Sequence, residues 1–336
     1  MTQVAVELGD LRGWAQQVGR ASGDMDASHD YATTHIADAD FGKILELITG
    51  DYAALIGKFH DILSADSDGL GSTRDALSSA ATAYHDADEQ VAGNVAQVAG
   101  QATTIVDDGV ANGFDDGASA AAQLITPGSQ GATLPDPPEV SFGWILDKVC
   151  ELVAWVGGPD LRVEVTRWIA GDVDKAARHV GAWQAVANCL DVVEANLASG
   201  KVNIGGTWTG TAAAAAIAHM DKWSTALTDQ SSAMRTMAQH LADAINEAVK
   251  MAQVVVDIIR TIVSVISAGL ANAAIPFYGQ WKLISSVKEA ITMIWSAIKV
   301  IQVFWNMLNL IIDTIQMAIA SFSRESLPPA PAAVPA

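Results

Sequence analysis

Seven histidines and two cysteines are the side chains best suited to catalysis or metal binding, and their spacing forms no such site. The histidines show no HExxH or other metal-ligand pattern, and neighbours such as His85 and Asp86 point apart on a helix. Cys150 and Cys189 also lack ligand spacing; they fit one disulfide in an oxidising compartment, or two buried thiols, the commoner outcome. No phosphate-binding glycine loop occurs. The sequence therefore predicts no enzyme activity, no metal and no cofactor.

The charge of the chain argues against a nucleic-acid partner. Its 336 residues hold 19 Lys and Arg against 38 Asp and Glu, a net charge of −19. Residues 1–140 hold 5 basic against 22 acidic residues, so a net charge of −17 lies in this part. Such a segment repels phosphate backbones and anionic membranes, and it keeps a protein soluble.

The elements that carry any functional residue are predicted to be helices, since apolar residues recur at gaps of three, four and seven. In residues 1–107 this pattern covers 4–37, breaks at 38–42, and resumes at about Asp51, which predicts a helical hairpin. The following segment, 108–141, is rich in glycine and proline. We expect it to be a mobile linker.

Residues 142–255 predict a second hairpin, preceded by a short apolar helix over 142–158. We expect Asp160 to cap a helix that runs from Leu161 to Ala198, where Ser199 and Gly200 end it. A loop over 201–207 then leads to a helix from Thr211 toward Ser267. No strand is predicted, and the expected fold is all-α: two long helical hairpins forming an elongated four-helix bundle.

Residues 256–323 form an apolar helical region with two interpretations. The uncharged run 261–281 reaches the ~20 residues that a membrane span needs, whereas Lys299 and Asp313 divide the next apolar stretch into pieces too short to span. A buried hairpin that extends the bundle or mediates self-association is the first interpretation, and membrane insertion is the second. The tail, 324–336, is rich in proline and alanine, and its residues 327–331 are predicted to be extended.

The turn Trp208-Thr209-Gly210 is predicted to join the two helices of the second hairpin. Glycine allows a tight connection, the tryptophan ring can be buried across the bundle end, and the alanines that follow let a partner helix approach closely. Over residues 160–255 this arrangement resembles the WXG family of type VII secretion substrates. The ordinary alternative is a helix–helix turn with a capping glycine.

Tyr84 and Asp88 are four residues apart, so both lie on one face of the helix. Together with the surrounding Ala-x-x-Tyr-x-x-Ala-Asp-Glu, they resemble the Tyr-x-x-x-Asp export signal of EspC-like substrates, over about residues 4–107. An amphipathic helix with a capping carboxylate is the plain alternative. The two hairpins in one chain resemble the EspB-like fused substrates, which implies a composite export signal of Trp208, Gly210, Tyr84 and Asp88.

The resemblance implies a non-enzymatic protein of a type VII (ESX) secretion system in an actinobacterium, secreted or at the cell surface. Its partners would be the export ATPase and a dedicated secretion chaperone, with self-association or membrane contact through 256–323. Residues 1–20 carry Glu7 and Asp10 and lack the apolar core of a Sec signal peptide, so export would be leaderless. Two alternatives stay open: the trafficking module of a polymorphic toxin, and a membrane-inserting pore former.

Overall fold

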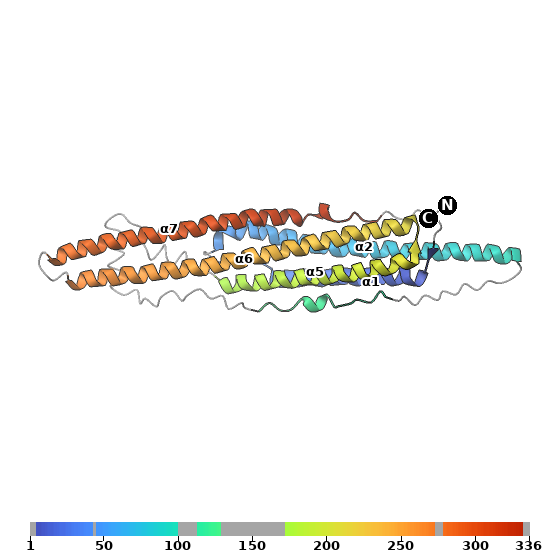
Figure 1. Ribbon diagram of the computed structural model, residues 1–336, viewed down its shortest axis with the longest axis horizontal. Helices are drawn as coiled ribbons and strands as arrows, with labels where there is room; N and C mark the ends of the chain where they lie inside the picture. The colour runs from blue at the N-terminus through green and yellow to red at the C-terminus, as the bar shows by residue number, and fades with distance from the viewer. Residues whose placement is uncertain (1–4, 43–44, 100–112, 129–171, 273–277, 332–336) are drawn as a thin grey trace.

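The structure is a computed structural model that describes residues 5–42, 45–99, 113–128, 172–272 and 278–331. These residues are almost entirely helical, which confirms the all-α fold (Figure 1). The long helices of the described part are α1 (Leu8–His35), α2 (Glu46–Ala99), α5 (Val173–Thr207), α6 (Thr211–Asn272) and α7 (Tyr278–Ser321). Two 3₁₀ turns, η2 (Ala121–Gln123) and η3 (Arg324–Ser326), and two short strands, β1 (Ala5–Val6) and β2 (Trp208–Thr209), complete the elements.

The helices pack around one core as a ring. α1 contacts α2 and α5, α6 contacts α5 and α7, and α7 closes the ring against α2. The hairpin α1–α2 therefore packs on the hairpin α5–α6 within one chain. The prediction of four bundle helices with a separate apolar region was incomplete, because the second half of α7 belongs to the bundle. At one end of the molecule the first part of α7 and the end of α6 extend beyond the other helices, and at the other end α2 does (Figure 1).

Aromatic side chains hold the hairpins together. The Trp183 indole donates a hydrogen bond of 2.7 Å to the Tyr52 hydroxyl, which also lies 3.1 Å from Nδ1 of His179. Phe59 of α2 packs against Trp183 at 4.2 Å between ring centroids, and Phe322, just after α7, lies 5.6 Å from Phe59. Buried rings of this size contribute much of the apolar area that stabilises a bundle.

The boundaries of α5 differ from those predicted at both ends. Asp172 is the N-cap, and its carboxylate accepts a 2.8 Å hydrogen bond from the backbone amide of Lys175; the predicted cap, Asp160, lies outside the described residues. At the other end the helix continues through Gly200 to Thr207, so the predicted end at Ala198 and loop 201–207 were wrong. Gly200 serves close packing here, because a Cβ at this position would lie 1.8 Å from Oε1 of Gln17.

The first residues of the chain also differ from the prediction. The helix predicted from residue 4 begins at Leu8, and the preceding Ala5–Val6 pairs antiparallel with Trp208–Thr209. The expectation of no strand was therefore wrong at this point. Two residues per strand are too few to show an alternating pattern in the sequence. α2 begins at Glu46, ahead of the predicted Asp51.

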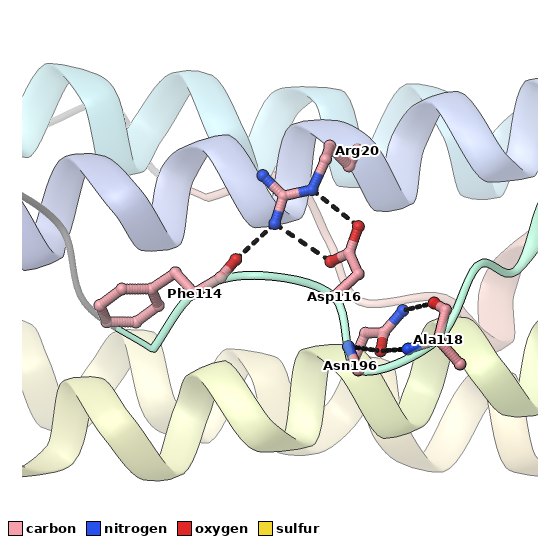
Figure 2. Close-up of polar contacts among 6 residues, drawn as sticks. Arg20, Phe114, Asp116, Ala118 and Asn196 are labelled. Atoms are coloured by element: carbon pink, nitrogen blue, oxygen red, sulfur yellow. Dashed lines mark hydrogen bonds and ion pairs between the residues drawn. The ribbon is translucent and has the colours of Figure 1, made fainter.

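Residues 113–128 pack against the bundle, so the prediction of a mobile linker was wrong for this part of 108–141. Figure 2 shows the Arg20 guanidinium of α1 paired with Asp116 at 2.7 Å and hydrogen-bonded to the carbonyl of Phe114. From α5, the Asn196 amide accepts from the backbone of Gly117 at 2.9 Å and donates to the carbonyl of Ala118 at 2.9 Å. Side chains of both hairpins thus fix this segment, which we call the strap. The remainder of 108–141 and the predicted helix at 142–158 lie outside the described residues.

The thiol of Cys189 is free and buried, and it accepts a hydrogen bond of 3.2 Å from the Ser28 hydroxyl. Burial raises the pKa of this thiol to about 12, which keeps it protonated and unreactive at neutral pH. Cys150, the other cysteine of the possible disulfide, lies outside the described residues.

One stretch of the described helices, Lys288–Ala318 in α7, is long and apolar enough to cross a membrane by length and composition, and 22% of it is buried. The prediction that Lys299 and Asp313 leave only pieces too short to span a membrane was therefore wrong, because the stretch that contains both charges is still long and apolar enough. The other candidate, 261–281, includes residues 273–277, which lie outside the described part.

Candidate functional site

The backbone on both sides fixes the position of Trp208. It follows directly on α5, and its amide donates to the carbonyl of Ile204 in the last turn. Val6 pairs with it across the short ladder, and the Glu7 amide donates to the Thr207 carbonyl at 3.1 Å. These contacts turn the Trp208 side chain into the bundle end, where it is 3% exposed.

Gly210 forms the turn that connects Trp208 to α6. Its φ is +112°, a conformation that other residues rarely adopt. Its carbonyl accepts a 3.0 Å hydrogen bond from the amide of Ala214, which forms the first turn of α6. Glycine at this position is therefore required by the geometry of the connection, as the sequence indicated.

Tyr84 of α2 meets Trp208 at this end. Their ring centroids are 6.3 Å apart and their planes are at 84°, an edge-to-face contact. Trp14 of α1 lies 6.3 Å from Trp208 at 70° on another side. Such pairs contribute roughly 0.5–1.5 kcal/mol beyond the area they bury. The structure thus brings Trp208 and Tyr84, from separate hairpins, into one aromatic cluster.

Asp88 lies one helical turn beyond Tyr84 and is exposed. The structure places no other described group in a hydrogen bond or ion pair with its carboxylate. Asp86 and Glu89 beside it are exposed as well. In Figure 1, α2 continues past the other helices at this end of the molecule. The carboxylate of Asp88 is therefore accessible to solvent.

An apolar pocket of about 320 Å³ opens beside the cluster, between α2 and α6. Trp14 and Trp208 form one side of it, and neither indole N–H has a hydrogen-bond partner among the described residues. Pro331 of the C-terminal tail lies at the pocket, and Pro328 before it is buried. The tail is extended where it leaves η3, with φ −77° and ψ 149° at Leu327, as the proline content predicts.

A histidine forms the polar side of the pocket. Nε2 of His219 lies 3.0 Å from the Thr73 hydroxyl and accepts a 3.1 Å hydrogen bond from the Trp223 indole. Burial lowers the pKa of His219, with a further contribution from the positive charge of Lys222. The lowered pKa favours the neutral form of this histidine.

Sequence reasoning missed Trp14 and Pro331 as members of this site. In the sequence, Trp14 fits only the apolar face of the helix predicted over 4–37, and Pro331 only an extended tail. The spacing along one helix cannot show which residues of other helices meet at its end. Among the described residues, no group of three or more His, Cys, Asp or Glu side chains could hold a metal ion.

No family model, curated protein or solved structure matches this chain in comparisons with known proteins. The geometry at the end of the bundle and the two sequence motifs are the features of the chain that bear on its function.

Proposed function

We propose that the protein is a non-enzymatic substrate of a type VII (ESX) secretion system, and that the end of the bundle around Trp208 and Tyr84 is its export signal. The edge-to-face contact of these two rings carries the proposal. The motifs lie in different hairpins and far apart in sequence, yet their rings meet at one end of the bundle.

The exposed carboxylate of Asp88 would supply the charged part of this signal. A partner that recognises this signal would bind the Asp88 carboxylate, the Tyr84 ring and the turn at Gly210 together. In the proposed function this partner is the export ATPase, and a dedicated chaperone would bind the same acidic end. The protein would then act outside the cell through its helices.

Export from an actinobacterial host that carries an ESX system tests the proposal. We expect the full chain in the culture filtrate when the export ATPase is active and only in the cell pellet when it is inactivated. A cytoplasmic marker in the same filtrates controls for lysis. Equal amounts of the chain in both filtrates would contradict the proposal.

Asp88→Ala is the sharpest variant for the same assay, because it removes an exposed carboxylate that has no partner among the described residues. We expect export to fall at least tenfold with the thermal unfolding midpoint unchanged. The matched control is Asp86→Ala, an equally exposed carboxylate two residues away on another face of α2. Normal export of Asp88→Ala, or equal loss in both variants, would show that Asp88 is not read as a specific signal.

A further inference from the structure

The outer face of α7 has a pattern that is symmetric about Asn306. Trp295 lies eleven residues before Asn306 and Met317 eleven after it, while Lys299 lies seven before and Asp313 seven after. At 3.6 residues per turn, these five positions fall within about 20° of one line along the helix. All five are exposed, Trp295 by 58% and Met317 by 65%.

Two large apolar side chains extend this face on either side of Asn306. Val303 is 69% exposed and Leu310 is 67% exposed. The opposite side of α7, which includes Ile294, Phe304, Leu308 and Ile315, is buried against the bundle. The helix runs along one edge of the molecule, and no described element covers its outer face (Figure 1).

We propose that this face binds the same face of a second copy of the chain, with the two α7 helices antiparallel and a two-fold axis through Asn306. Residues at equal distances before and after Asn306 would then lie opposite each other. Lys299 of each copy would face Asp313 of the other copy, so this ion pair would form twice. Trp295 would likewise pack on Met317 at both ends of the paired segment. The paired segment, 295–317, is ~33 Å long at 1.5 Å per residue.

Charge complementarity favours a second copy of the chain as the partner and an antiparallel arrangement of the two α7 helices. Lys299 and Asp313 are the only charged residues of α7 after Glu289, and neither has a partner among the described residues. A parallel pairing would place each of them against its own copy, which is repulsive. A lipid surface would leave both charges and the Asn306 amide unpaired along the middle of the face. The antiparallel dimer pairs all three, as a symmetric interface requires.

Charge reversal in the full-length protein tests the dimer by analytical ultracentrifugation. Lys299→Asp makes both facing pairs negative and Asp313→Lys makes both positive, so we expect each variant alone to weaken dimerisation by roughly tenfold or more. An equimolar mixture of the two variants restores opposite charges at both pairs and should form a heterodimer. Far-UV circular dichroism of each variant checks that the helices are unchanged.

A cysteine at the two-fold axis gives a second, independent readout. In a Cys150→Ser background, Asn306→Cys should form a disulfide-linked dimer under mild oxidation, because only this position of α7 faces itself. Lys299→Cys is the control: the two copies of that position would be ~21 Å apart and should not cross-link.

The proposal would be overturned if the wild-type chain stayed monomeric throughout the micromolar range. A dimer that neither charge reversal weakens, or equal cross-linking at both cysteine positions, would overturn it as well. Monomers that bind vesicles of phosphatidylglycerol and phosphatidylcholine through α7 would assign the face to a membrane and would also overturn it.

Discussion

At the scale of single residues, two glycines that look alike in sequence have different roles. Gly210 provides a positive φ at the turn after Trp208. Gly200 lies inside α5, where the sequence predicted an end, and allows α1 and α5 to approach closely. A Cβ at position 200 would lie 1.8 Å from Oε1 of Gln17 and 2.9 Å from Cδ1 of Trp14. The space available to the glycine, and not its helix propensity, decides its role.

Gly200→Ala is therefore expected to lower the free energy of unfolding by about 1–3 kcal/mol through overpacking. The matched control is Gly205→Ala in the same helix, where a Cβ would meet nothing within 4 Å. That change should stabilise the protein by up to about 1 kcal/mol, because alanine favours a helix over glycine. Urea denaturation followed by circular dichroism measures both. If Gly200→Ala also stabilised the protein, close packing would not be the reason for this glycine.

At the scale of the elements, polar side chains join α2 to α6 inside the core. Asp66 is fully buried, and its Oδ1 accepts a 3.1 Å hydrogen bond from the Gln230 amide. Burial raises the pKa of Asp66 to about 8, with the hydrogen bond from Gln230 acting in the opposite direction. Its Oδ2 and Oε1 of Gln230 have no partner among the described residues. Burying a charged carboxylate without partners for both oxygens costs free energy. A proton removes the charge, so Asp66 holds its proton at neutral pH.

This proton predicts a specific pH dependence of stability. The unfolded chain releases it near pH 3.8 and the folded protein only near pH 8, so stability falls as the pH rises between these values. His179 acts in the opposite direction, but only from about pH 4 to 6.5, because burial lowers its pKa to about 4. Between pH 6.5 and 8, we therefore expect the free energy of unfolding to fall by roughly 1.4 kcal/mol per pH unit.

Asp66→Asn should remove this slope, because the amide has the same shape and does not titrate. Urea denaturation of both proteins at pH 6.5, 7.2 and 8.0 measures the difference. Parallel curves for wild type and variant would mean that Asp66 is already ionised throughout this range.

At the scale of the whole molecule, the strap over 113–128 joins the two hairpins. It contacts α1 through Arg20 and Tyr31, whose hydroxyl donates to the carbonyl of Ile125 at 2.5 Å, and it contacts α5 through Asn196. Phe114 of the strap is buried, with 4% exposure. The strap therefore favours pairing of the hairpins within one chain, and this pairing forms the surface at Trp208 and Tyr84.

Arg20→Ala should release the strap and speed chymotrypsin cleavage after Phe114 severalfold, since the bonds to Asp116 and to the Phe114 carbonyl are lost. Mass spectrometry of the fragments identifies this cut among others. Arg74→Ala is the control, because within the described part of the chain the Arg74 guanidinium pairs only with its neighbour Asp75. Equal cleavage of wild type and Arg20→Ala would show that other contacts hold the strap.

The sequence by itself determined the helical class, the two hairpins and the pair of motifs. Apolar spacing reports which face of a helix is buried, and the positions of Trp208, Gly210, Tyr84 and Asp88 are local features. Only the tertiary structure decided that α7 joins the bundle, that α5 continues through Gly200, and that Trp14 and Pro331 lie beside Trp208. The physical reason is that these outcomes depend on contacts between residues distant in the chain, and such contacts leave no periodic pattern in either partner.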